Sequence, residues 1–239
     1  MRTPQRVLRT GLPFAFLLLG AAADASGQTA TKHAVPVYRE ARHHLVFENA
    51  LVRVLDVRVP AGDTTDFHVH ANRHIAVVIA DARTWDQSER EATPQSASAP
   101  MPTGTVFDNG DHALPYTHRV ANVDTVGFRY IVAQLLAPSG VASANLASSS
   151  GLRLDHEVFG ARIYRVALAP GQSTPTHRHA SPGLTVQVNA GTLRVDGAKP
   201  EGKSDASGAG AWWWRGAGTE HTLRNSGTTT VEVVEIDWP

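Results

Sequence analysis

Two pairs of histidines, each separated by one residue, are the residues of this sequence best suited to chemistry. They are His68 with His70 and His177 with His179. Successive side chains of a β-strand point to opposite faces, so both imidazoles of a pair point to the same side if the pair lies on a strand. Two imidazoles one strand step apart can share one metal ion. The spacing therefore predicts a metal site at each pair.

A third histidine follows each pair after about 45 residues. His118 follows the first pair and His221 the second, and an asparagine comes four positions later in both cases, at Asn122 and Asn225. A residue this far along the chain lies on a different strand from the pair. It can complete a set of three nitrogen ligands, which is a common arrangement in metal sites.

These histidines belong to an internal repeat. When the chain is shifted by 109 residues, Gly62 meets Gly171 and His68 meets His177, together with Arg53 and Arg162. A shift of 103 residues pairs the later histidines and asparagines. The change of shift fits an insertion in a Ser-, Ala- and Pro-rich loop at 86–104 of the first copy. The sequence is a tandem duplication.

Short β-strands are predicted to carry these histidines. Apolar and β-branched runs separated by Gly, Pro, Asn and Asp turns occupy 50–59, 75–80, 127–136, 162–168, 184–188, 192–195 and 230–236. No stretch keeps the 3.6-residue apolar period of a helix, so the chain is predicted to be all-β. The repeat predicts an N-terminal domain at 45–137, a linker at 138–155 and a C-terminal domain at 156–239.

The two histidine patterns resemble the motifs of the cupin superfamily. Its first motif is G-x5-H-x-H-x3 or x4-E-x6-G, and its second is G-x5-P-x-G-x2-H-x3-N. The second half matches at Gly171, His177, His179, Gly191, Gly210, Gly218, His221 and Asn225, and the first half at Gly62, His68, His70, His118 and Asn122. The resemblance implies two tandem cupin β-barrels of the jelly-roll type, a bicupin, over residues from about 45 to 239.

The motif glutamate is missing from both halves. Its position holds His74 or Ile75 in the first half and Gly183 or Leu184 in the second, depending on the spacing used. The second half is therefore expected to be a three-histidine site with open coordination positions, resembling the three-histidine iron sites of some cupin dioxygenases. His74 is a fourth candidate ligand in the first half. On this count the second half is the expected place for chemistry, and the alternative that the first half is a metal-free barrel stays open.

The absence of cysteine excludes thiolate metal sites and cysteine nucleophiles. Histidine nitrogens suit several divalent transition metals, so Fe, Mn, Cu, Ni and Zn all remain candidates. The hypothesis is an exported metal-binding bicupin that acts as a metal-dependent oxygenase, such as a dioxygenase, on a small organic substrate. The alternative is a non-catalytic periplasmic protein that binds a metal or small ligand.

The first 25 residues have the layout of a secretory signal peptide. Arg2, Arg6 and Arg9 precede an apolar stretch at 12–23, and Ala23-Asp24-Ala25 is a typical cleavage site. The mature chain is expected to begin at Ser26, to be periplasmic or secreted, and to have no membrane partner after cleavage. Removing residues 1–25 leaves 19 basic and 21 acidic residues. The mature chain therefore has no excess of basic residues that would indicate nucleic-acid binding. The sequence leaves a homodimer open.

Other residues are weaker candidates. Trp212 and Trp214 could line a pocket together or fill a core, and Arg53 and Arg162 could meet an anionic substrate or form structural pairs. Asn122 and Asn225 are expected to fix turns near their histidines. The histidines outside the motifs are not assigned to a site; they are His33, His43, His44, His112 and His156.

Overall fold

The computed structural model of the chain describes residues 33–110, 112–137, 146–197, 199–205 and 207–239. The predicted signal peptide at 1–25 and the first part of the predicted linker, 138–145, lie outside these residues, so both stay predictions. Lys32–Pro239 form one compact unit.

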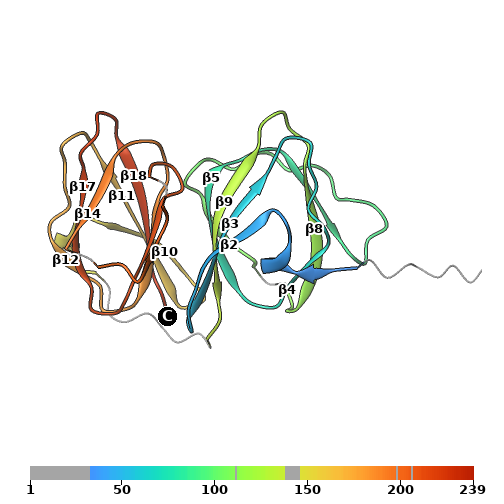
Figure 1. Ribbon diagram of the computed structural model, residues 1–239, viewed down its shortest axis with the longest axis horizontal. Coiled ribbons are helices and arrows are strands. Elements are labelled where there is room, and N and C mark those ends of the chain that lie inside the picture. The colour runs from blue at the N-terminus through green and yellow to red at the C-terminus, as the bar shows by residue number, and fades with distance from the viewer. Residues whose placement is uncertain (1–32, 111, 138–145, 198, 206) are drawn as a thin grey trace, which may run out of the picture. The chain divides into compact units, whose positions relative to one another are not determined.

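The N-terminal half consists of two facing sheets (Figure 1). The larger sheet has the strand order β2 (His43–Glu48), β3 (Val52–Val59), β9 (Phe128–Leu135), β5 (His74–Ala80) and β7 (Val106–Asp108). The smaller sheet has the order β1 (Val35–Pro36), β4 (His68–His70), β8 (Tyr116–Asn122) and β6 (Thr84–Ser88). A 3-10 helix, η1 (Val37–Arg39), follows β1.

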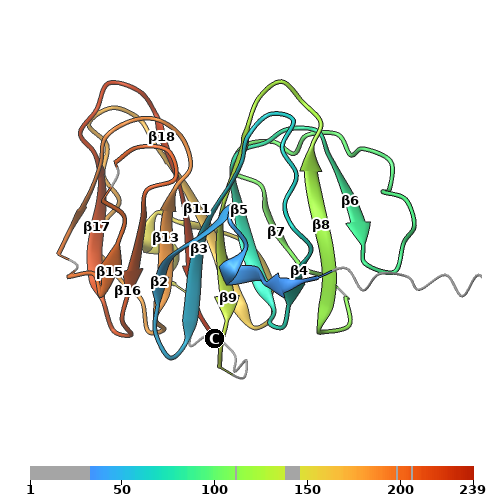
Figure 2. The same cartoon turned by 45° about the vertical axis from the view of Figure 1, so that its right-hand side comes forward.

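The C-terminal half repeats this plan, as Figure 2 shows from a second side. Its larger sheet has the order β10 (Arg153–Val158), β11 (Ala161–Leu168), β18 (Val231–Asp237), β13 (Gly183–Gln187), β16 (Trp212–Arg215) and β15 (Gly202–Lys203). Its smaller sheet has the order β12 (His177–Arg178), β17 (Glu220–Asn225) and β14 (Leu193–Asp196). A 3-10 helix, η2 (Ser148–Ser150), precedes β10.

The duplicated sequence thus forms two jelly-roll units, and the all-β prediction is confirmed. Each unit is a sandwich of two sheets rather than a fully closed barrel. The strands begin before the predicted domain starts of 45 and 156, at β1 and β10. The repeated Gly62 and Gly171 have φ of 71° and 77°, a conformation that favours glycine, which explains why the turn before each histidine pair keeps this residue.

Period-2 alternation places the core residues of the two larger sheets. On β9, Ile131 and Ala133 lie in an apolar cluster shared by both halves, while Val132 points into the N-terminal unit. On β18, Val234 and Ile236 join the shared cluster, so Glu235 between them faces the interior of the C-terminal unit. This alternation decides which residues can reach the histidines.

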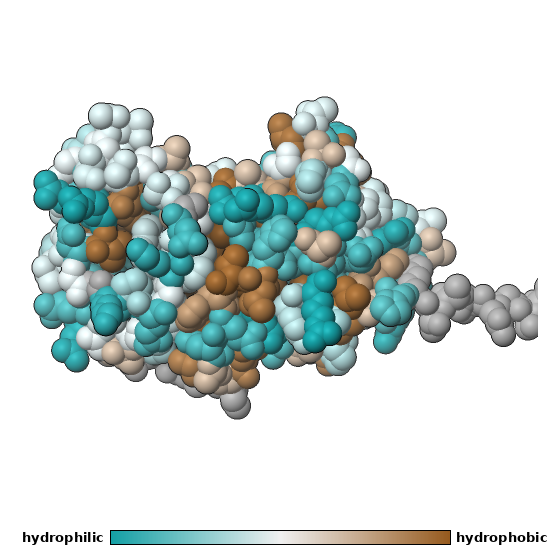
Figure 3. All heavy atoms as spheres, in the orientation of Figure 1, coloured by the Kyte–Doolittle hydropathy of each residue, from teal (hydrophilic) through white to brown (hydrophobic). Residues whose placement is uncertain are grey.

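Polar residues cover most of the face drawn in Figure 3, with smaller apolar patches between them. Among the described residues, the exposed large apolar side chains are those of Leu45, Val46, Val123, Val126 and Leu154. Within the described ranges, no helix is long and apolar enough to cross a membrane.

Candidate metal centres

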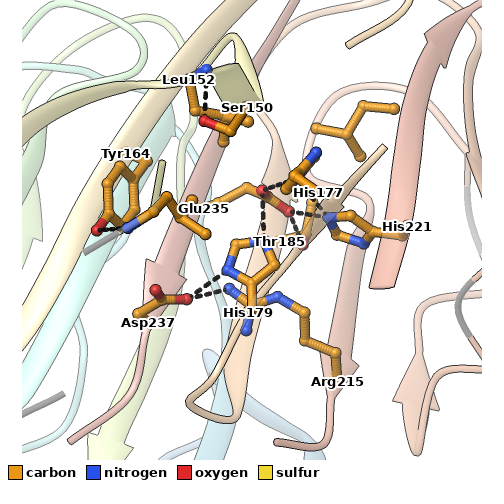
Figure 4. A network of polar contacts seen from close by, with 12 residues as sticks. Ser150, Leu152, Tyr164, His177, His179, Thr185, Arg215, His221, Glu235 and Asp237 are labelled. Carbon is orange, nitrogen blue, oxygen red and sulfur yellow. Dashed lines mark hydrogen bonds and ion pairs between the residues drawn. The ribbon is translucent and has the colours of Figure 1, made fainter. Parts of the chain in front are cut away.

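Four buried side chains converge inside the C-terminal unit. The pairing of β12 with β17 sets His177 opposite His221, and their Nε2 atoms lie 2.9 Å apart. Glu235 enters from β18, and its carboxylate lies 3.3 Å from Nε2 of His177 and 3.1 Å from Nε2 of His179. Its other oxygen lies 3.3 Å from Nε2 of His221. Figure 4 shows Glu235 between the three imidazoles.

The remaining nitrogens of two imidazoles are held by partners that fix the rings. Nδ1 of His177 donates to the carbonyl of Pro175 at 2.9 Å. Nδ1 of His179 contacts the carboxylate of Asp237 at 2.6 Å, and Arg215 donates to the same oxygen at 2.6 Å. Such contacts leave each Nε2 directed at the cluster, as they do for metal-binding histidines.

Glu235 carries a negative charge in this cluster. Its side chain is fully buried, which would raise the pKa of the carboxyl group, but hydrogen bonds with the three histidines outweigh burial and hold the pKa well below its usual range. Thr185 also donates to it at 2.6 Å. Burial would lower the pKa of His179, but its bonds to Asp237 and Glu235 raise it. The ionised carboxylate is suited to bind a cation.

The N-terminal unit contains the equivalent triad. The pairing of β4 with β8 sets His68 opposite His118, and Nε2 of His118 lies 3.1 Å from Nε2 of His70. Nδ1 of His68 donates to the carbonyl of Asp66 at 2.9 Å, which repeats the contact of His177 with Pro175. Nδ1 of His118 contacts the Asp86 carboxylate at 2.5 Å. The ligand atoms of the triad lie within 4.8 Å of one another.

The carboxylate is absent from the N-terminal triad. In the register of β3, β9 and β5, the position of Glu235 is taken by Val132, and the position of its partner Thr185 is taken by Ala76. The two halves therefore offer different ligand sets: three histidines in the first and three histidines with one glutamate in the second.

His74 lies beside the N-terminal triad without joining it. Its ring centroid is 4.9 Å from that of His70, but its nitrogens are not among the atoms that converge. Burial lowers the pKa of His74 to about 3. The position of His74 in the N-terminal unit is occupied in the C-terminal unit by Gly183, where a side chain would collide with Arg215.

A cavity of about 450 Å³ opens onto the N-terminal triad. Two histidines that the motifs left out also line it. The ring centroid of His43 lies 4.6 Å from that of His68, and His112 stacks on Tyr116 with centroids 4.6 Å apart. Tyr116 in turn stacks on His70 at 4.7 Å. The motifs left these two histidines unassigned, and the fold brings their rings to the same cavity.

The C-terminal cluster has less space around it. A cavity of about 210 Å³ reaches His221 and Thr185, and the four ligand candidates are all buried. The motif comparison places a glutamate only near the His-x-His pair, so it predicts a three-histidine site in this half. That ligand set is incomplete, because Glu235 supplies a fourth group from the last strand. The expected preference for chemistry in the second half, which rested on its lower ligand count, loses its basis.

The weaker candidates take part in core packing, ion pairs and hydrogen bonds to the backbone. Trp212 and Trp214 are buried in the apolar cluster shared by the halves. Arg53 contacts Glu48 at 2.6 Å, and Arg162 contacts Glu157 at 2.7 Å. The side-chain amide of each motif asparagine donates to one carbonyl at a strand end and one in the following turn: Asn122 to Val59 and Val126, and Asn225 to Leu168 and Thr229.

Both donor sets fit a divalent transition-metal ion. They combine neutral imidazole nitrogens with at most one carboxylate, and partners on the opposite nitrogens orient most of the rings. The structure thus brings His68, His70 and His118 together, and His177, His179 and His221 together. Metal binding by these residues stays a prediction.

Comparison with solved structures identifies the fold. The chain is similar to AerE from Microcystis aeruginosa at 12% identity, with a TM-score of 0.56 over 81% of this chain and 90% of that one. It is similar to YhhW from Escherichia coli at 16% identity, with a TM-score of 0.54 over 82% and 89%. No family model matches the sequence, and no curated protein matches it.

An enzyme is also among these structures. Salicylate 1,2-dioxygenase from Pseudaminobacter salicylatoxidans is 10% identical, with a TM-score of 0.54 over 82% of this chain and 76% of that one. Identities this low show the fold alone. The chain has the cupin fold twice, with a cluster of buried or partly buried histidines in each copy.

Proposed function

We propose that the chain is a metal-dependent cupin oxygenase whose reaction chamber lies in the N-terminal unit. The observation that carries the proposal is the contrast between the two clusters. Three histidines face a cavity of about 450 Å³ in the first unit, while a glutamate completes a buried cluster in the second. Small-molecule sites occupy ~300–1,000 Å³, so the first cavity has room for a substrate.

The residues of the chamber have separate tasks in this proposal. A transition-metal ion held by His68, His70 and His118 would supply open coordination positions and redox chemistry. Asp86 holds His118 with Nε2 directed inward. The apolar side chains around the cavity exclude water from the substrate. The glutamate-containing cluster would hold a structural ion that braces the second unit.

The structural neighbour whose name states an activity, salicylate 1,2-dioxygenase, supports an oxygenase. That neighbour acts on salicylate by its name, and one of its structures contains gentisate adducts. Both are small organic compounds, which is the substrate class proposed for this chain. The competing hypothesis is a binding protein that holds a metal or small ligand without turnover.

Metal content and oxygen uptake test the proposal together. His70→Ala should remove about one metal ion per chain and abolish oxygen uptake on a panel of hydroxylated organic compounds. His179→Ala should remove the other ion and leave oxygen uptake per folded, metal-loaded chain largely intact. Oxygen uptake that depends on His179 and not on His70 would overturn the assignment. Ligand binding without turnover by the fully loaded protein would favour the binding protein.

We also propose that the chain is exported. The basic start, the apolar stretch at 12–23 and the Ala-x-Ala site support this. N-terminal sequencing of protein from the native cell should find Ser26 as the first residue in the periplasmic or secreted fraction. An intact Met1 on cytoplasmic protein would contradict it.

A further inference from the structure

The walls of the N-terminal cavity are mainly apolar and aromatic. Val57 and Val132 line it from the larger sheet and Val120 from the smaller sheet. Phe128 stacks on Tyr130 with ring centroids 4.7 Å apart, and Phe107 meets the same Tyr130 edge to face at 5.4 Å. Such walls favour a flat, largely apolar molecule.

Among the described residues that line this cavity there is no lysine or arginine. Alternation along β8 explains part of this, because His118 and Val120 face the cavity while Arg119 between them donates to Gln87. At the mouth, Arg73 donates to the backbone carbonyls of Gly110 and His112 and does not line the cavity. A second acidic group on a substrate would find no lysine or arginine there.

The two carboxylates of the cavity wall already have partners. Asp86 contacts His118 at 2.5 Å, and Asp108 accepts from the backbone N–H of Gly110 at 2.5 Å. The small cavity of the C-terminal unit differs, since Lys203 and Arg215 both line it. The lack of basic side chains is therefore a property of the N-terminal cavity and not of the fold.

The histidine triad adds a requirement for a single acidic hydroxyl. A divalent ion on three neutral imidazoles keeps its full positive charge, because the position of Glu235 is Val132 in this unit. A phenolic or enolic hydroxyl that loses its proton can supply the missing negative oxygen. A carboxylate elsewhere on the molecule would lose much of its hydration in this cavity and would find no lysine or arginine to pair with, which is costly.

We propose that the N-terminal cavity takes a flat hydroxylated compound of the phenol or enol type that carries no charged acid group away from the hydroxyl. The proposal rests on the proposed function for the assignment of the triad as a metal site. It sets the substrate apart from a compound that combines a hydroxyl with a remote carboxylate.

A matched pair of ligands tests this with zinc-loaded protein, so that no turnover is involved. Catechol and 3,4-dihydroxybenzoate differ by one carboxylate remote from the hydroxyls. Calorimetry should show catechol binding at least tenfold more tightly, with binding lost in His70→Ala and kept in His179→Ala. Equal affinity, tighter binding of the benzoate, or no binding of catechol would overturn the inference.

A variant that adds a positive charge at the cavity mouth tests the same charge argument in the opposite direction. His112 is exposed and lines the mouth, so His112→Arg should place a cation there without disturbing the core. The preference for catechol should then narrow several-fold. The same change at the exposed His44 on β2, outside the cavity, should leave the preference unchanged. An unchanged preference in His112→Arg would contradict the charge argument.

Metal content of the same samples separates the two proposals. If His70→Ala removes metal and wild-type protein shows no ligand preference, only the substrate inference falls. If His70→Ala leaves the metal content of the protein unchanged, the proposed function falls and the substrate inference falls with it.

Discussion

Asp86 is the side chain outside the N-terminal triad with the most direct influence on it. It reaches Nδ1 of His118 from β6 across the smaller sheet. A carboxylate in this position fixes the imidazole ring and makes its other nitrogen a stronger ligand. In the C-terminal unit a carboxylate contacts a different member of the triad: Asp237 contacts Nδ1 of His179, which is the counterpart of His70 and not of His118. Each unit thus orients one imidazole of its triad with its own carboxylate.

Asp86→Asn should therefore weaken metal binding at the N-terminal site by ~10–100-fold, the usual effect of losing such a partner. The C-terminal site should keep its affinity. Competition with a chelator, followed by metal analysis, measures both. Asp108→Asn is the matched control, because Asp108 lines the same cavity and contacts Gly110 rather than a histidine. Equal losses in the two variants would contradict a role specific to Asp86.

At the scale of elements, strand register decides which ligand set each unit carries. Val132 on β9 and Glu235 on β18 occupy the same position of the duplicated sheet, and Ala76 and Thr185 stand beside them. Val132→Glu with Ala76→Thr should therefore convert the first cluster to the ligand set of the second. We expect tighter metal retention at this site and loss of catechol binding, because the carboxylate takes the position that the ligand oxygen would use.

The control for this exchange is Val132→Gln with Ala76→Thr, which fills the same space without the charge. Chelator competition should show no gain in metal retention for the glutamine variant. Without metal, the glutamate variant should also unfold at a lower denaturant concentration than the glutamine variant, since its buried carboxylate then lacks a cation. Equal metal retention in the two variants would show that the carboxylate does not reach the triad.

The sequence predicted the strands, the duplication and six converging histidines because each follows from local spacing. Period-2 alternation places His177 and His179 on the same face of one strand. For His221, which is more distant in the sequence, the signal was the internal repeat. Glu235 was missed for a physical reason: it lies 56 residues from His179, and only the pairing of β18 with β13 brings it inside. Its signal was a carboxylate flanked by Val234 and Ile236 in a strand rich in valine and isoleucine, where burial on both faces is typical. His43 and His112 were missed because their approach also depends on pairing between distant strands.

A carboxylate on the edge strand β10 makes the free energy of unfolding depend on pH. Partial burial would raise the pKa of Asp155, but hydrogen bonds from Arg165 and His156 lower it to about 2. A lowered carboxyl pKa stabilises the folded state above the pKa of the unfolded chain, and this contribution disappears as pH falls toward 2. Asp155→Asn should cost about 2 kcal/mol of unfolding free energy at neutral pH and progressively less between pH 4 and 2.

Denaturant unfolding of wild type and variant across this pH range measures the difference. Asp196→Asn, at an exposed carboxylate on β14, is the control and should show a small difference from wild type. A gap between wild type and Asp155→Asn that stays constant down to pH 2 would contradict the assigned cause.

At the scale of the whole described unit, the two jelly rolls share one apolar core. Residues of both larger sheets pack in a single cluster that includes Val54, Ile131, Ile163 and Trp214. Polar contacts also join the halves: Arg129 donates to the carbonyl of Ala209 at 2.8 Å, and Trp238 donates to that of Leu51 at 3.3 Å. Neither larger sheet could expose this face without placing a broad apolar surface in water.

The shared core predicts that the halves unfold together. Trp214 is fully buried and packs edge to face on Trp238, with ring centroids 5.7 Å apart. Trp214→Ala should lower the unfolding free energy by ~3–5 kcal/mol, as expected for a large buried aromatic residue, in a single transition. Hydrogen exchange followed by mass spectrometry should show peptides of β9 and β18 losing protection by equal amounts. Trp213→Ala, outside the shared cluster, should cost less. If β18 loses protection while β9 keeps the wild-type value, the units are energetically independent and the shared core does not couple them.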